Sequence, residues 1–150
     1  MAVKAEKKYV LTNRRSGKVL TANGAEAVQL AANGSDEQIW RAIPTEGTAV
    51  QLVNKATGMF LCVNEETENG APVVLSEAAQ EWKLTTTTKG FRKLVHVASA
   101  KIVDIKEISD DDFAPAQLWE FVKGENQEWV AEEVEKEKKA PAKRAAKTSK

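Results

Sequence analysis

The sequence predicts an all-β fold built from three repeats related by pseudo-threefold symmetry. The pattern Gln-x-Trp occurs at residues 38–40, 80–82 and 117–119, with the first two tryptophans 42 residues apart and the second and third 37 residues apart. Such spacing is the length of one small supersecondary unit. No helical pattern of apolar residues occurs before position 126, which favours strands in the body of the chain.

A second pattern recurs in register with the tryptophans. Residues 11–22, 52–63 and 94–105 each read as a strand, then a turn with Asn or His followed by Ser or Thr and a small residue, then a second strand. Asparagine bonds its own backbone in turns, and Gly17 and Gly58 tolerate a positive φ. The apolar, partly β-branched segments that follow suit strands. The three repeats are therefore expected at about residues 8–46, 48–88 and 90–123.

The recurring tryptophan and glutamine have different expected roles. Three tryptophans related by symmetry can fill one core, because each buries about 150 to 250 Å². A glutamine has both a donor and an acceptor, so it can satisfy the backbone of a neighbouring strand. The residues expected to form this structural core are Gln38, Trp40, Gln80, Trp82 and Trp119.

Three repeats of about forty residues, each ending in Gln-x-Trp, resemble the ricin B-chain type of β-trefoil lectin. The resemblance covers roughly residues 8–123, and a fourth Gln-x-Trp at residues 127–129 falls outside the repeat register. The resemblance implies twelve short strands, six closing a barrel and six forming a hairpin cap over one end. It also implies carbohydrate binding, most commonly of galactose-like sugars.

The resemblance further implies where a sugar binds. In such lectins each repeat uses an aspartate soon after the turn, an aromatic residue on the following hairpin, and an Asn just before the glutamine. The residues at the aspartate position are Thr21, Cys62 and Asp104. Those near the aromatic position are Ala31, Ser76 and Ala114, and those at the Asn position are Glu37, Ala79 and Ala116. Only the third repeat keeps the aspartate.

The third repeat is therefore the predicted carbohydrate-binding site. Asp104 is expected to accept hydroxyls, Phe113 to provide a stacking platform one residue from the aligned position, and Gln117 to support the site. Asp112 is expected to line the loop together with the rest of the acidic run at 110–112. A structural interpretation stays open, in which Asp104 bonds backbone amides at a strand end and Phe113 belongs to the core.

Other kinds of site lack their motifs. The sole histidine, His96, aligns with the turn asparagines, and Cys62 lies between apolar residues with no activating partner. The acidic run at 110–112 lacks the glycine and closing glutamate of a calcium loop. No nucleophile elbow, zinc motif or phosphate-cradling loop is present. We expect no enzymatic activity, no cofactor and no metal.

The C-terminal end differs in composition from the rest of the chain. We expect residues 1–124 to form the β-trefoil domain, residues 125–139 a charged helix capped by Asn126, and residues 140–150 a disordered basic tail. The segment 136–150 holds seven basic residues and one acid, which leaves the first 135 residues with a net charge of minus six. This segment suggests weak nucleic-acid contact, or simply a solvated end.

Two functions are compatible with the sequence. One is binding of a glycan or glycoprotein, which the retained Asp104 favours. The other is a trefoil interaction scaffold that binds no sugar and uses its basic tail on nucleic acid or another acidic partner, which the loss of most pocket residues favours. We expect a cytoplasmic protein without a membrane span, because the sequence shows no signal sequence, no long apolar run and only one cysteine.

Overall fold

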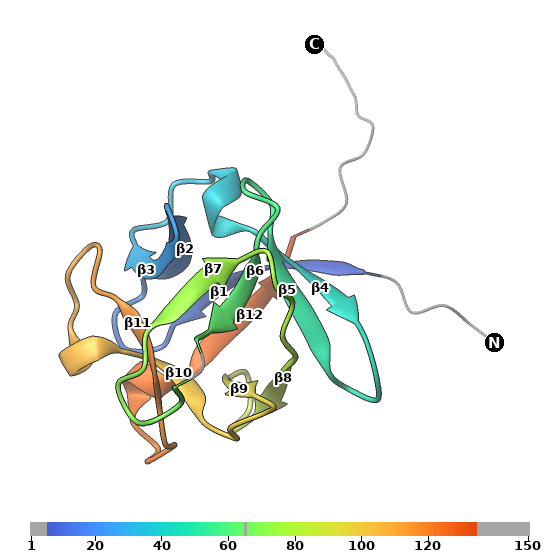
Figure 1. Ribbon diagram of the computed structural model, residues 1–150. Helices are drawn as coiled ribbons and strands as arrows, with labels where there is room; N and C mark the ends of the chain where they lie inside the picture. Colours follow the sequence, from blue (N-terminus) through green and yellow to red (C-terminus); the bar gives the residue numbers. More distant parts are fainter. Residues whose placement is uncertain (1–5, 65, 135–150) are drawn as a thin grey trace, which may run out of the picture.

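The computed structural model describes residues 6–64 and 66–134, which form three four-stranded repeats (Figure 1). The first repeat consists of β1 (Lys7–Asn13), β2 (Val19–Asn23), β3 (Glu26–Leu30) and β4 (Trp40–Pro44). The second consists of β5 (Val50–Asn54), β6 (Phe60–Val63), β7 (Val73–Ser76) and β8 (Trp82–Thr86). The third consists of β9 (Arg92–His96), β10 (Ile102–Ile105), β11 (Ala116–Trp119) and β12 (Trp129–Glu133). Short 3-10 turns occur at η1 (Asp36–Gln38), η2 (Lys106–Ile108) and η3 (Glu125–Gln127).

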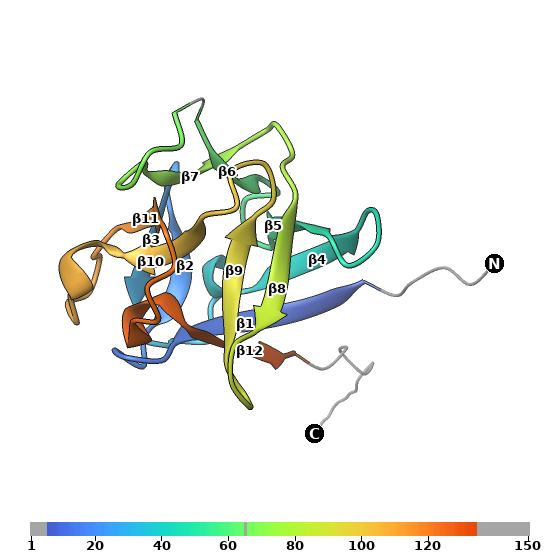
Figure 2. The same ribbon diagram turned by 90° about the horizontal axis from the view of Figure 1, so that it is seen from below.

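Six of the strands close a barrel, as the resemblance implies. Antiparallel pairs join β1 to β4, β4 to β5, β5 to β8, β8 to β9, β9 to β12 and β12 back to β1. The other six form the hairpins β2–β3, β6–β7 and β10–β11. In Figure 2, β8 lies beside β9 and β1 beside β12. The predicted β-trefoil with pseudo-threefold symmetry is confirmed.

The strand register repeats three times. The first residue of the last strand in each repeat pairs with the last residue of the first strand of the next repeat. These pairs are Trp40 with Asn54, Trp82 with His96, and Trp129 with Asn13. The third pair closes the ring, because it joins the end of the third repeat to the first.

The three tryptophans in this register form the centre of the core. Each is fully buried, and each indole N–H donates to a main-chain carbonyl at the start of the cap hairpin in its own repeat. The bonds run from Trp40 to Leu20 (3.0 Å), from Trp82 to Leu61 (2.9 Å) and from Trp129 to Val103 (3.1 Å). A buried indole therefore has both its apolar body and its donor satisfied.

The third core tryptophan is Trp129, and the prediction of Trp119 is wrong. Trp119 ends β11 in the cap hairpin and keeps 36% of its surface exposed. The motif at 127–129 occupies the position that the motifs at 38–40 and 80–82 have in their repeats. The third repeat is longer because ten residues separate β10 from β11 and nine separate β11 from β12.

The expected helix at 125–139 is also wrong over its described part. Residues 125–127 form one 3-10 turn, and β12 then pairs with β1 from Asn13–Trp129 to Tyr9–Glu133. The barrel needs a sixth strand here, and this pairing outweighs the small stabilisation from helical charge pairs. The trefoil domain therefore continues to Glu133 and does not end at residue 124.

The turns that open each cap hairpin follow the predicted asparagine pattern. Asn13 accepts from the backbone N–H groups of Arg15 and Ser16, and its Nδ2 donates to the Asn126 carbonyl (3.0 Å). Asn54 does the same in the second repeat. The predicted turn role of His96 agrees with the bond between its Nδ1 and Ser99 (2.8 Å).

The predicted basic tail, residues 140–150, and the segment 136–150 lie outside the described residues. Within the described ranges, no helix is long and apolar enough to cross a membrane.

Candidate functional site

A cavity of about 480 Å³ lies in the third repeat beside the β10–β11 hairpin. Asp104, Gln117 and Gln127 line it with polar groups, and Ile108, Trp119 and Val122 line it with apolar ones. The hairpin is coloured yellow to orange in Figure 1, next to η2. The cavity thus combines a few polar groups with mostly apolar walls, which is typical of small-ligand sites.

Asp104 provides the buried acceptor of this cavity. It lies on β10 directly opposite Gln117 of β11 and is only 4% exposed. Its Oδ2 accepts from Gln127 Nε2 at 3.3 Å, whereas Oδ1 has no hydrogen-bond partner among the described residues. Burial raises the pKa of the Asp104 carboxyl, and the side-chain amides of Gln117 and Gln127 partly oppose that rise. A buried oxygen without a partner is one that a ligand hydroxyl can satisfy.

Trp119 provides the aromatic surface. It follows Gln117 by two residues on β11, so both side chains lie on the same face of the hairpin. Gly70 of the second repeat packs against the ring, since a Cβ at Gly70 would lie 4.0 Å from Trp119 Cζ3. The Gly70 N–H also donates to the Leu118 carbonyl (2.7 Å). This neighbour holds one side of the ring and leaves part of the ring facing the cavity.

Gln127 connects the carboxylate to the loop that follows β11. Its Oε1 accepts from the backbone N–H groups of Val122 (2.8 Å) and Gly124 (3.2 Å). Its Nε2 donates to the Glu120 carbonyl (2.9 Å) as well as to Asp104. One side chain therefore fixes both the loop and the orientation of the acceptor.

Asn126 precedes Gln127, so the third repeat does have an Asn before its glutamine. The prediction of Ala116 at this position is wrong, because the Gln-x-Trp motif that ends the third repeat is the one at 127–129 and not the one at 117–119. Asn126 is 6% exposed and its Nδ2 donates to the Ile105 carbonyl (3.2 Å), which ties the loop to the end of β10. Asn126 also lines the cavity.

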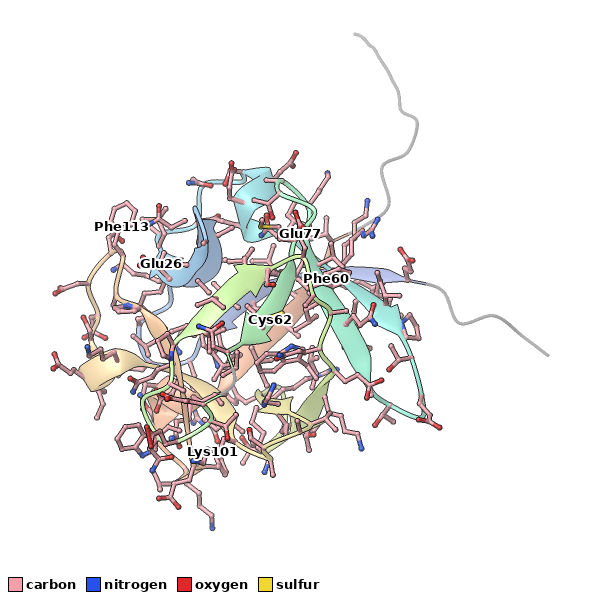
Figure 3. The ribbon with its side chains drawn as sticks, in the orientation of Figure 1. Glu26, Phe60, Cys62, Glu77, Lys101 and Phe113 are labelled. Atoms are coloured by element: carbon pink, nitrogen blue, oxygen red, sulfur yellow. The ribbon has the colours of Figure 1, made fainter. Side chains whose placement is uncertain are left out.

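Phe113 and Asp112 do not belong to this cavity. Phe113 is 56% exposed, and its N–H donates to the Gln29 carbonyl (2.7 Å) of β3. Figure 3 shows Phe113 at the edge of the molecule. An Asp112 oxygen accepts from the Ala31 N–H (3.3 Å) and lies 3.8 Å from Lys18 Nζ. The ten-residue loop between β10 and β11 carries both residues toward the first repeat.

The other two predicted site residues lie in the cavity, as the sequence indicated. Three further residues of the cavity were not predicted as site residues. Asp104 and Gln117 face each other in the cavity. The sequence analysis assigns Trp119 to the core, Asn126 to the cap of a helix, and Gln127 to a motif outside the repeat register. The sequence signal that could have identified them is Asn126 directly before Gln127 and Trp129, which is the expected Asn followed by Gln-x-Trp.

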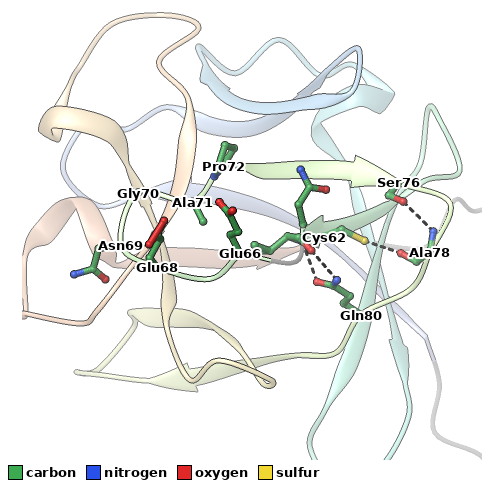
Figure 4. A pocket seen from close by; sticks show the side chains of 12 residues that line it. Cys62, Glu66, Glu68, Asn69, Gly70, Ala71, Pro72, Ser76, Ala78 and Gln80 are labelled. Carbon is green, nitrogen blue, oxygen red and sulfur yellow. Dashed lines mark hydrogen bonds between the residues drawn. The ribbon is translucent and has the colours of Figure 1, made fainter.

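The second repeat has a larger cavity, of about 800 Å³, but it differs in chemistry (Figure 4). Cys62 replaces the aspartate, and its thiol donates to the Ala78 carbonyl (2.6 Å). Ser76 stands at the strand position of Trp119, opposite Phe60. Gln80 uses both its amide atoms on the backbone of Val63. This cavity has neither a buried carboxylate nor an aromatic ring in the positions that the third repeat fills.

The first repeat lacks the same groups. Thr21 stands at the aspartate position, and its hydroxyl donates to the Val19 carbonyl (2.8 Å) and accepts from Gln38 (3.3 Å). Leu30 stands at the position of Trp119, opposite Val19. Only the third repeat therefore combines the carboxylate, the aromatic ring and the Asn-Gln pair. Over the described parts of the chain, no group of three or more His, Cys, Asp or Glu residues is arranged to hold a metal ion.

The third-repeat arrangement can bind a ligand that has neighbouring hydroxyls on one side and an apolar face on another. A carboxylate oxygen accepts from hydroxyls, and amide groups of glutamine and asparagine both donate and accept. A tryptophan ring offers a large flat surface for an apolar face.

Comparison with known proteins places this architecture among sugar-binding modules. A family model described as ricin-type β-trefoil lectin domain-like matches residues 2–76. ThreeFoil, a designed 3-fold symmetric protein, is 30% identical with a TM-score of 0.80, over 85% of this chain and 99% of that one. The Macrolepiota procera ricin B-like lectin, solved in complex with lactose, is 19% identical with a TM-score of 0.80, over 88% and 99%.

An enzyme contains a module of the same shape. An exo-β-1,3-galactanase from Clostridium thermocellum is 30% identical with a TM-score of 0.80, over 89% of this chain and 31% of that one. The present chain thus spans less than a third of that enzyme. No sequence among the curated proteins matches the chain.

Proposed function

We propose that this chain, which belongs to the ricin-type β-trefoil lectin domain-like family, binds a galactose-type glycan through one site in its third repeat. The observation that carries the proposal is the buried Asp104, whose Oδ1 lacks a hydrogen-bond partner in a cavity that Trp119 also lines. Two hydroxyls of a sugar can bond this carboxylate while the apolar face of the ring lies on the indole. The ligand is a free glycan or the glycan of a glycoprotein.

The comparisons support carbohydrate binding in general. Solved lectins share the fold, and one of them was solved with lactose, a galactose-containing sugar. The galactanase that contains a similar module acts, by its name, on a galactose polymer. The galactose preference is our proposal, because the likeness to the lactose-bound lectin is one of fold.

The proposed role is binding without catalysis. Glycoside hydrolysis uses two carboxylates that flank the scissile bond. In the third-repeat cavity Asp104 is buried, whereas the other acid, Glu107, lies on the exposed η2 turn. The proposal therefore assigns Asp104 to hydroxyl recognition.

The test is a calorimetric titration of lactose into the wild-type chain, Asp104→Asn and Cys62→Ser. Cys62 occupies the equivalent position of the second repeat, so it is the matched control. We expect one site per chain, an affinity at least tenfold weaker in Asp104→Asn, and no change in Cys62→Ser.

Two results would count against the proposal. Wild-type affinity in Asp104→Asn would place the sugar elsewhere on the chain. No binding of lactose or of any member of a glycan panel by the wild type would overturn the lectin function and favour the interaction scaffold.

A further inference from the structure

The cavity of the third repeat carries more apolar surface than a sugar ring requires. Three exposed apolar side chains line it: Ile108, which is 54% exposed, Trp119, which is 36% exposed, and Val122, which is 63% exposed. Two more large apolar residues, Val97 and Phe113, are exposed elsewhere among the described residues. Apolar side chains that gather at one cavity mark a binding surface, whereas scattered ones do not.

Ile108 and Val122 come from two different loops and reach the same cavity. Ile108 ends η2, which follows β10, and Val122 lies between β11 and η3. The backbone of Ile108 adopts a φ of 55°, which is rare for a β-branched residue and unfavourable. The Val122 N–H donates to Gln127 Oε1 (2.8 Å), so the side chain that orients Asp104 also positions Val122. Both residues line the cavity, and the bond to Gln127 fixes the backbone of Val122 there.

The size of the cavity agrees with a ligand larger than one pyranose. Its volume of about 480 Å³ lies in the range of pockets that enclose drug-sized molecules. Trp119 alone can stack against the apolar face of the sugar. The sugar ring then makes no contact with Ile108 or Val122. A free hexose offers hydroxyls in the other directions, and hydroxyls gain nothing from apolar partners.

We infer that the site recognises a glycoside with an apolar aglycone, and that Ile108 and Val122 contact this aglycone. The inference rests on the proposed function, because it needs the sugar bound at Asp104 and Trp119. The sugar fixes the ligand through the carboxylate, and the group attached to it covers the exposed aliphatic side chains. Burial of this apolar area adds affinity that a sugar with a polar or methyl substituent lacks.

The experiment compares methyl β-galactoside with 4-nitrophenyl β-galactoside by calorimetric titration. We expect the wild type to bind the aryl glycoside about tenfold more tightly than the methyl glycoside. In a double variant, Ile108→Ser with Val122→Ser, that ratio should fall close to one. Both residues are exposed, so thermal unfolding should show an intact fold.

Phe113→Ser is the matched control, because Phe113 is as exposed as Ile108 but lies outside the cavity. It should keep the wild-type ratio. Equal binding of the two glycosides by the wild type, or an unchanged ratio in the double variant, would overturn the inference and leave the sugar site standing. Failure of the wild type to bind either galactoside would overturn the proposed function and this inference together.

Discussion

At the scale of single residues, the position of Asp104 separates the third repeat from the other two. The equivalent residues are Thr21 and Cys62, whose side chains bond main-chain carbonyls and are thereby satisfied inside the fold. Asp104 has one oxygen bonded to Gln127 and one without a partner. A buried carboxylate with an unused oxygen destabilises the folded state unless a ligand satisfies it. We interpret this arrangement as the sign of a retained function.

The pKa of Asp104 leads to a prediction about pH. Burial raises this pKa above its ordinary value of 3.8, and the proposed hydroxyl contacts need the ionised form. Lactose affinity should therefore be full above the raised pKa and fall as the pH drops through it, at a higher pH than for an ordinary aspartate. Calorimetric titrations between about pH 7 and pH 4 measure this loss.

The protonation of Asp104 does not itself destabilise the fold at acid pH. A raised folded-state pKa means that the folded chain binds the proton more tightly than the unfolded chain, so this group adds stability as the pH falls through the same range. The free energy of unfolding of the wild type, relative to Asp104→Asn, should rise toward acid pH while lactose affinity falls. A lactose affinity that stays constant down to pH 4 would contradict the role of Asp104.

At the scale of elements, β12 decides how the third repeat is interpreted. Trp129 opens β12 and is buried, whereas Trp119 ends β11 and faces the cavity. The two tryptophans thus have opposite roles, one in the core and one at the site.

This assignment predicts opposite effects for two substitutions. Trp129→Ala removes a buried ring and its bond to the Val103 carbonyl, so it should lower the free energy of unfolding by about 3 to 5 kcal/mol. Trp119→Ala should change stability by less than about 1 kcal/mol and abolish lactose binding. Urea unfolding and calorimetric titration measure the two effects. Trp82→Ala is the control and should match Trp129→Ala, whereas a larger loss of stability in Trp119→Ala would contradict the assignment.

The elements of the first two repeats could be predicted from the sequence, but the end of the third repeat could not. Two Gln-x-Trp motifs lie near its end, and the 42-residue spacing of the first two tryptophans does not decide between them, because Trp119 lies five residues short of that spacing and Trp129 five residues beyond it. Surface loops lengthen at little thermodynamic cost, so the two long loops of this repeat hide its register. The number of strands could have identified the correct motif. A third repeat ending at residue 123 leaves no segment for the twelfth strand that the β-trefoil requires.

The candidate site, too, could be predicted from the sequence only in part. Asp104 could be found because it lies in the second strand of the strand–turn–strand pattern that recurs three times in the chain. The aromatic partner could not, because its distance from Asp104 depends on the loop between β10 and β11. Strand pairing places Gln117 opposite Asp104 and Trp119 opposite Ile102, and this register is visible only in the folded hairpin. Phe113 lies closer in sequence, but its backbone N–H donates to the Gln29 carbonyl of the first repeat and its side chain is outside the cavity.

At the scale of the whole molecule, one symmetric barrel carries three unequal repeats. The core tryptophans and their indole bonds to the cap hairpins occur three times, so the core is alike in the three repeats. The loops differ in length and in chemistry, and only the third repeat keeps a carboxylate, an exposed indole and an Asn-Gln pair. The central claim is therefore a β-trefoil with a single sugar site.

The most direct test uses the four tryptophan indole N–H signals in an ¹⁵N NMR spectrum. Trp40, Trp82 and Trp129 are fully buried and donate to main-chain carbonyls of the cap hairpins, whereas Trp119 is partly exposed at the cavity. On addition of lactose, we predict that the Trp119 signal, assigned with Trp119→Phe, shifts and saturates as a single site while the other three move little. Larger shifts of Trp40 or Trp82, several saturation steps, or no shift of Trp119 would contradict the account.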